Sequence, residues 1–134
     1  MFIRFVCGEI NEHSHRAAGL FCAVTLLQET CYVPKYEVEA VDEIVLWFER
    51  HLKSPFSYLR EYPQYDLAIC WFKPTAHEYL AKAWELVTIL ERNDILIWTI
   101  KSHRTGHVYY EDEFQVFAIP YDEIRRRRWY KIPG

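Results

Sequence analysis

Residues 67–100, LAICWFKPTAHEYLAKAWELVTILERNDILIWTI, decide the fold. The first six residues of this segment are apolar throughout, and the last six are apolar except for Thr99, which is typical of strands covered on both faces of a sheet. Two strands joined by one helix form a right-handed crossover, which makes them parallel. The segment therefore predicts two parallel, buried strands at the centre of a sheet.

The part between the two strands predicts a helix over residues 76–92. Its apolar residues recur at intervals of three and four, which places them on one helical face. Thr75 and Glu78 have the spacing of a capping box, in which the threonine oxygen accepts a hydrogen bond from the third amide of the helix. We therefore expect Thr75 to cap this helix, and Asn93 and Asp94 to end it.

The remaining elements follow from the same periodicities. Alternating apolar residues predict strands, and apolar residues three and four apart predict helices, with Pro34 favourable at a helix start. The expected order is β-α-α-β-α-β-β-β, in an α/β (or α+β) domain with a single mixed sheet of about five strands and helices packed on it. The predicted elements outside the central segment are strand 2–6, helices 17–31 and 34–52, and strands 107–110 and 114–119.

Composition favours one folded domain. The chain has 134 residues, of which 51% are hydrophobic and 17% aromatic, enough for a packed core. No run approaches the roughly 20 apolar residues of a membrane span, and Arg4 interrupts the N-terminal apolar run, so we expect a cytoplasmic protein without a membrane partner. The four cysteines have no metal-binding spacing and lie among apolar neighbours, so we expect buried free thiols at Cys7, Cys22, Cys31 and Cys70.

Charge is unevenly distributed along the chain. The net charge is −3, but residues 125–134 carry four arginines and Lys131 and no acid, while residues 1–124 carry 11 bases and 19 acids. We therefore divide the chain into a domain, residues 1–124, and a basic C-terminal tail, residues 125–134. Arg125 to Arg128 beside Trp129 and Tyr130 combine charge with stacking rings, so nucleic acid is a candidate partner of the tail alone. A solvated tail, or a clasp onto the acidic body, is the alternative.

A candidate binding site follows from the predicted sheet. Ligands of open α/β sheets bind outside the carboxyl ends of parallel strands, where loops and helix N-termini meet. If the first strand is parallel to the two central ones, three cationic, histidine-rich loops share that edge, and Glu111, Asp112 and Glu113 project from the opposite one. We expect this edge to bind an anionic ligand. Its candidate residues are His13, His15, Arg16, Lys73, Thr75, His77, Lys101, His103 and Arg104.

A metal-dependent reading of the same loops is the alternative. His13 and His15 have an H-x-H spacing, which suggests a metal site because neutral imidazoles are common ligands of transition metals. A third ligand would come from His103, His107 or Glu12. Phosphate-binding loops, dinucleotide fingerprints and nucleophile elbows are absent from the sequence. No cofactor is therefore expected.

Residues 84–87, WELV, and residues 108–112, VYYED, resemble small bacterial proteins of unknown function. The resemblance covers the second half of the chain and implies no activity. Two hypotheses follow from the residues themselves. The first is a non-catalytic binding or regulatory domain that recognises an anionic small molecule or a protein partner and is able to form a homodimer. The second is a small phosphate-directed hydrolase or transferase that uses the loop histidines.

Overall fold

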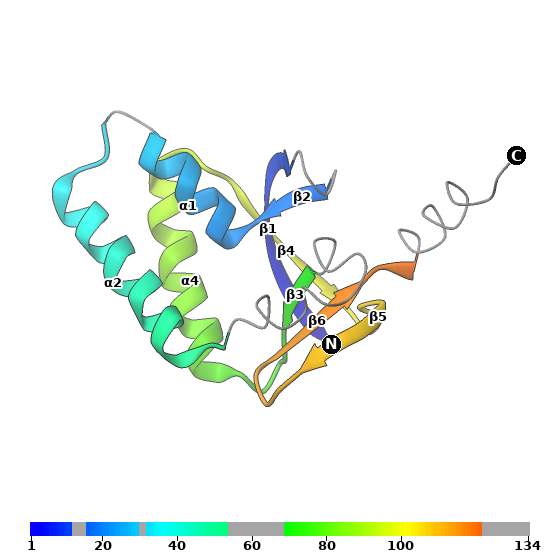
Figure 1. Cartoon of the computed structure of the whole chain (residues 1–134). Helices are drawn as coiled ribbons and strands as arrows, with labels where there is room; N and C mark the ends of the chain where they lie inside the picture. Colours follow the sequence, from blue (N-terminus) through cyan, green and yellow to red (C-terminus); the bar gives the residue numbers. More distant parts are fainter. Residues whose placement is uncertain (12–15, 30–31, 54–68, 122–134) are drawn as a thin grey trace, which may run out of the picture.

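The computed structural model describes residues 1–11, 16–29, 32–53 and 69–121 (Figure 1). The predicted class, helices packed on a single sheet, is confirmed, and the elements follow the predicted order with one additional strand after the first. The elements are β1 (Phe2–Asn11), β2 (Arg16–Gly19), α1 (Leu20–Glu29), α2 (Lys35–His51), β3 (Ile69–Phe72), α4 (His77–Arg92), β4 (Ile97–Ser102), β5 (His107–Glu111) and β6 (Gln115–Ile119).

The strands form one sheet in which β1 is the central member. The strands pair in the order β2-β1-β3-β6-β5, with β2 and β3 along different parts of the same side of β1. β4 pairs with β1 along its opposite side. Every pair of neighbours among the described strands is antiparallel, so the predicted mixed sheet is wrong in this respect. The reason is that β1 lies between β3 and β4, which were expected to pair with each other. The residues of β3 and β4 themselves do not indicate that another strand lies between them.

The two strands of the central segment nevertheless run in the same direction. Both β3 and β4 are antiparallel to β1, and Ile3 of β1 is opposite both Phe72 and Lys101. The helix that connects them, α4, crosses on one face of the sheet (Figure 1). The strands therefore end at the same edge of the sheet, separated by the width of one strand.

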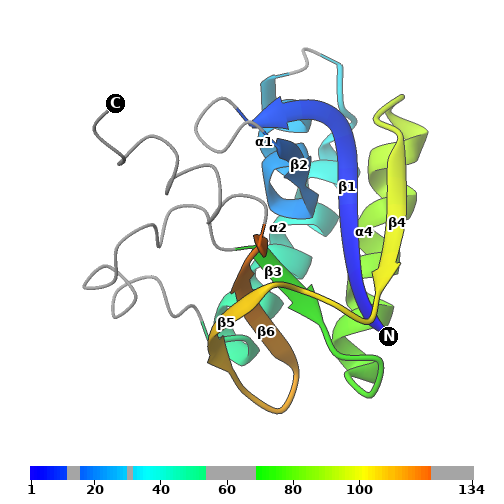
Figure 2. The ribbon, with the colours of Figure 1, turned by 90° about the vertical axis from the view of Figure 1, so that its right-hand side faces the viewer.

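The predicted positions of the two strands are half right. β3 lies inside the sheet, between β1 and β6, as expected. β4 has β1 as its one neighbour among the described strands, and Figure 2 shows it as the outermost strand on its side. Its alternate residues Trp98 and Ile100 are exposed, so the prediction that this apolar run is buried on both faces is wrong.

The core lies between the sheet and the three helices, which cover one face (Figure 1). The periodicity of each helix explains its burial: in α2, for example, Val41, Ile44 and Phe48 recur at three and four residues and are buried. The largest enclosed side chains include Leu27 of α1 and Leu86 and Leu90 of α4. Glu37 is buried at the start of α2 and accepts a hydrogen bond from the Asn93 amide (3.1 Å), which joins α2 to the end of α4.

Two predicted helix starts differ from the structure. Residues 16–19 form β2 against β1, and α1 begins only at Leu20, because pairing with β1 prevails over helical spacing. Ala76, not Thr75, is the N-cap of α4, and no side chain caps this helix. The Thr75 carbonyl oxygen instead accepts a hydrogen bond from the His77 N–H group (2.9 Å). The predicted capping box is therefore wrong.

Candidate functional site

The structure brings two of the three predicted loops to one edge of the sheet. Residues 73–77 follow β3 and residues 103–106 follow β4, and both strands end beside the N-terminal end of β1. Because β1 is antiparallel to both, its own carboxyl end points the opposite way. The prediction that the first loop shares this edge is therefore wrong for Arg16, which pairs with Asn11 at the far end of β1. His13 and His15 lie outside the described residues.

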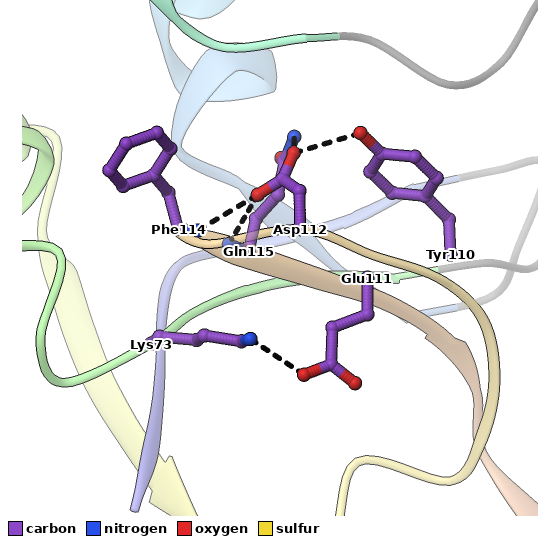
Figure 3. Close-up of polar contacts among 6 residues, drawn as sticks. All are labelled: Lys73, Tyr110, Glu111, Asp112, Phe114 and Gln115. Atoms are coloured by element: carbon purple, nitrogen blue, oxygen red, sulfur yellow. Dashed lines mark hydrogen bonds and ion pairs between the residues drawn. The ribbon is translucent and has the colours of Figure 1, made fainter.

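The acidic turn between β5 and β6 lies at the same edge as Lys73. The Lys73 ammonium forms a 2.6 Å ion pair with Glu111, and the Lys73 N–H group donates to the Phe114 carbonyl oxygen (2.8 Å) (Figure 3). The prediction that Glu111, Asp112 and Glu113 project from the opposite edge is wrong, because β6 pairs directly with β3 and places Gln115 opposite Phe72. The charge of Lys73 is consequently balanced by Glu111, and with Asp112 and Glu113 in the same turn the β3 end of the edge is acidic rather than cationic.

Asp112 organises this turn. One carboxylate oxygen accepts hydrogen bonds from the N–H groups of Phe114 (2.8 Å) and Gln115 (3.0 Å). The other accepts from the Tyr110 hydroxyl (2.9 Å) and from the Gln115 side-chain amide (3.0 Å) (Figure 3). Four donors thus converge on one carboxylate, a structural role that the preference of Asp for turns suggests and that the sequence analysis missed.

The Gln115 side chain extends this network into the interior. It is fully buried, and its amide nitrogen donates to the Lys53 carbonyl oxygen just beyond α2 (2.6 Å) as well as to Asp112. Its amide oxygen accepts a hydrogen bond from the Cys70 thiol (3.4 Å). One side chain therefore ties β6 to β3, to α2 and to the turn.

The cysteines of the described residues are free thiols. Burial, and to a lesser extent the charge of Asp112, raise the pKa of the Cys70 thiol to about 12, while Arg4 opposes both. Cys70 is therefore protonated at neutral pH and serves as a hydrogen-bond donor rather than as a nucleophile. Cys7 is buried as predicted, whereas Cys22 is exposed on α1, contrary to the prediction, and Cys31 lies outside the described residues.

The pKa of Asp112 has a consequence for stability at low pH. Burial raises this pKa, but the hydrogen bonds from Gln115, Phe114 and Tyr110 outweigh it, and the pKa lies below its ordinary value of 3.8. A carboxyl group with a lowered folded-state pKa stabilises the protein above its unfolded-state pKa and loses this effect as the pH falls through the folded-state value. The contribution should thus be complete at neutral pH and be lost progressively as the pH falls below about 4.

We expect the Asp112→Asn variant to be less stable than the parent chain at pH 7 by about 1 kcal/mol, since the group is partly screened by solvent. The difference should shrink between pH 4 and pH 2. Urea unfolding across this range measures it, with Asp42→Asn on the exposed side of α2 as the control. A difference that does not change with pH would show that the charge of Asp112 is not what stabilises the turn.

The β4 end of the edge keeps its predicted positive charge. His77, Lys101, His103 and Arg104 are exposed, and the structure records no ion pair for them within the described residues. Lys101 lies opposite Ile3, on the face of the sheet that α4 covers, and α4 begins at the same edge.

The peptide of Arg104 is held in place. The Ser102 hydroxyl donates to the Arg104 carbonyl oxygen (2.7 Å) and accepts from the Arg104 N–H group (3.1 Å). At the same edge, after β3, the first amides of α4 have no side-chain cap, and the dipole of the helix adds partial positive charge. The edge therefore offers an anion Lys101, Arg104 and His103 after and within β4, and His77 with backbone donors at the start of α4.

Two further features bear on the alternatives. No group of three or more His, Cys, Asp and Glu residues in the described part of the chain is arranged to hold a metal ion, and the H-x-H pair is outside that part.

A hollow of about 320 Å³ lies between α2 and α4, away from the edge, and is lined by both acids and bases, among them Glu43, Glu85, Lys82 and Arg92. The predicted basic tail, residues 125–134, also lies outside the described residues.

No helix among the described residues has the length and apolar character needed to cross a membrane. Comparison of the chain with protein-family models, with curated proteins and with solved structures gave no match.

Proposed function

We propose that this protein is a non-catalytic binding domain that recognises an anionic small molecule at the β4 end of the sheet edge. The observation that carries the proposal is that Lys101, His103 and Arg104 are exposed, form no ion pair within the described residues, and lie at the sheet edge where α4 begins at His77 without a side-chain cap. Phosphate and carboxylate groups are the anions that arginine, lysine and helix N-termini bind. The site is smaller than the sequence suggested, because Lys73 is paired with Glu111.

A binding role fits this chemistry better than catalysis. The described thiol nearest the edge network, that of Cys70, is protonated at neutral pH, and Asp112 accepts four hydrogen bonds within its own turn. These groups stabilise the fold rather than face a substrate. The hydrolase alternative depends on His13 and His15, which lie outside the described residues, and it stays a prediction.

The Lys101→Ala and Arg104→Ala variants test the proposal. Each removes one charge-assisted contact to the anion, so we expect inorganic pyrophosphate to bind about tenfold or more weakly to each variant. Isothermal titration calorimetry measures the affinity. Lys35→Ala and Arg50→Ala, which remove exposed cations from α2, should bind as the parent chain does. Equal losses in all four variants would indicate a general charge effect, and no loss in any of them would refute the site.

The cellular setting and the oligomeric state belong to the same proposal. Free thiols at Cys7, Cys22 and Cys70 are typical of a reducing compartment, which supports a cytoplasmic location. A regulatory binding domain commonly works as a symmetric dimer, and we include a homodimer in the proposal. The tail remains a candidate contact for nucleic acid, and the bacterial origin suggested by the resemblance remains a prediction.

A further inference from the structure

One side of β4 is a strand edge with which no other described strand pairs. Six residues of β4 pair with β1 in one continuous register, from Phe2 opposite Ser102 to Cys7 opposite Ile97. Proteins usually protect such an edge with a charge, a proline or a bulge. Residues 97–100 of β4 contain no charge and no proline, and their pairing with β1 has no irregularity. The one charge of this strand is Lys101, next to its last residue.

The outer face of β4 also presents an apolar row. Leu96, Trp98 and Ile100 alternate along the chain, and 61%, 54% and 38% of their respective surfaces are exposed. Trp98 and Ile100 lie on the face of the sheet opposite the helices, because their partners Val6 and Arg4 on β1 alternate with the core residues Phe5 and Cys7. Leu96 immediately precedes β4. An exposed apolar row beside an unprotected strand edge is typical of an interaction surface.

The charges at the two ends of this segment identify the partner. Asp94 stands before the apolar row, and Lys101 and Arg104 stand at its end, so the segment is acidic at one end and basic at the other. A second copy placed antiparallel brings the acidic end of each chain to the basic end of the other. A parallel copy would oppose like charges, which disfavours that arrangement.

We infer that β4 pairs antiparallel with β4 of a second copy of this chain, with Thr99 on the twofold axis. In this register each Trp98 is opposite Ile100 of the other copy, and Asp94 is brought toward Arg104 of the other copy. Aromatic pairs with β-branched residues and Thr pairs with Thr are favourable across strands. The arrangement extends the sheet through both copies and brings the two apolar rows into lateral contact on one face of it. The inference identifies the surface of the proposed homodimer. It shares Lys101 and Arg104 with the proposed anion site, and it is tested in the absence of an anion.

Sedimentation equilibrium of the full chain tests the interface. We expect a dimer that Ile100→Lys weakens by about a hundredfold, because two lysines would replace apolar contacts close to the axis. Val38→Lys is the matched control, since Val38 on α2 is 39% exposed, almost the same as Ile100. A monomeric parent chain at about 100 μM would overturn the inference, since a specific dimer is at least this tight. A dimer that withstands Ile100→Lys would also overturn it.

A charge exchange and a crosslink test the orientation. Asp94→Lys should weaken the dimer about tenfold, and the double variant with Arg104→Asp should restore it. Thr99→Cys should form a reducible covalent dimer on oxidation, because directly opposite residues of antiparallel strands lie within disulfide distance. All chains in this test carry Cys22→Ser, which removes the exposed thiol of α1. The Cys22→Ser chain alone and its Val38→Cys variant should not form the covalent dimer. A dimer without this crosslink would contradict the twofold axis at Thr99.

The anion site and the interface can fail separately. Pyrophosphate affinity measured on the Ile100→Lys variant tests the site in the monomer, whereas sedimentation in the absence of pyrophosphate tests the interface. Loss of the dimer with retained anion binding supports the inference as stated. If Ile100→Lys loses both the dimer and pyrophosphate binding while circular dichroism shows intact folding, the anion site does not form in the monomer.

Discussion

Replacing Gln115 with Leu is expected to lower the free energy of unfolding by about 3–5 kcal/mol, although the two side chains have similar volumes. The Gln115 amide is fully buried and bonds to Lys53, Asp112 and Cys70, which belong to three different parts of the fold. Leucine cannot replace these bonds. It would leave the Lys53 carbonyl oxygen and the Cys70 thiol without partners, and each buried polar group so deprived costs about 1–3 kcal/mol.

Urea unfolding at neutral pH measures this loss. Gln28→Leu is the matched control, because Gln28 is exposed on α1, and it should change the stability by less than about 0.5 kcal/mol. A second variant, Gln115→Glu, would keep the shape of the side chain but place a charge beside Asp112, and it should be at least as destabilising. If Gln115→Leu costs less than about 1 kcal/mol, the buried network does not hold the hairpin to the helical layer.

Replacing Gly106 with Ala is expected to cost about 3–4 kcal/mol of stability, through backbone strain and a steric clash. Gly106 has a φ angle of +114°, which other residues rarely adopt. A Cβ atom there would lie 2.2 Å from the Ile119 carbonyl oxygen and 2.8 Å from the Pro120 Cα atom. These are backbone atoms of β6 and its end, so they cannot move aside as a side chain would.

The same substitution should weaken anion binding, because Gly106 ends the segment that carries His103 and Arg104. Thermal unfolding and pyrophosphate titration of one sample measure both effects. Gly19→Ala is the matched control: its Cβ atom would meet one backbone oxygen at 4.0 Å, and its backbone has no positive φ. If Gly106→Ala and Gly19→Ala unfold at the same temperature, the close approach of the Ile119 and Pro120 backbone does not constrain residue 106.

The helical part of the fold could be predicted from the sequence because its signals are local. Val41, Ile44 and Phe48 are buried at the spacing that predicted them, and α2 begins directly after Pro34. The direction of a strand is not a local property, since alternating residues look the same from either end. Nothing in residues 2–6 therefore distinguished an antiparallel β1 from a parallel one, and this decided which loops meet.

The candidate site was predicted in part for the same reason. Lys101, His103 and Arg104 were placed correctly at the edge because the direction of β4 follows from the crossover through α4. Glu111 was placed at the wrong edge because its position depends on β6 pairing with β3, a contact between residues more than 40 positions apart. The exposure of Trp98 was missed because an apolar strand at a sheet edge has the same composition as one inside it.

The most direct test of the proposed function is a titration of the isotope-labelled chain with inorganic pyrophosphate, followed through its backbone amide resonances. We expect the largest shifts at His77 and the next residues of α4, and between Ser102 and Thr105, with little change at the α2–α4 hollow. Shifts confined to that hollow, or no saturable shift at millimolar pyrophosphate, would contradict an anion site at the β4 end of the sheet.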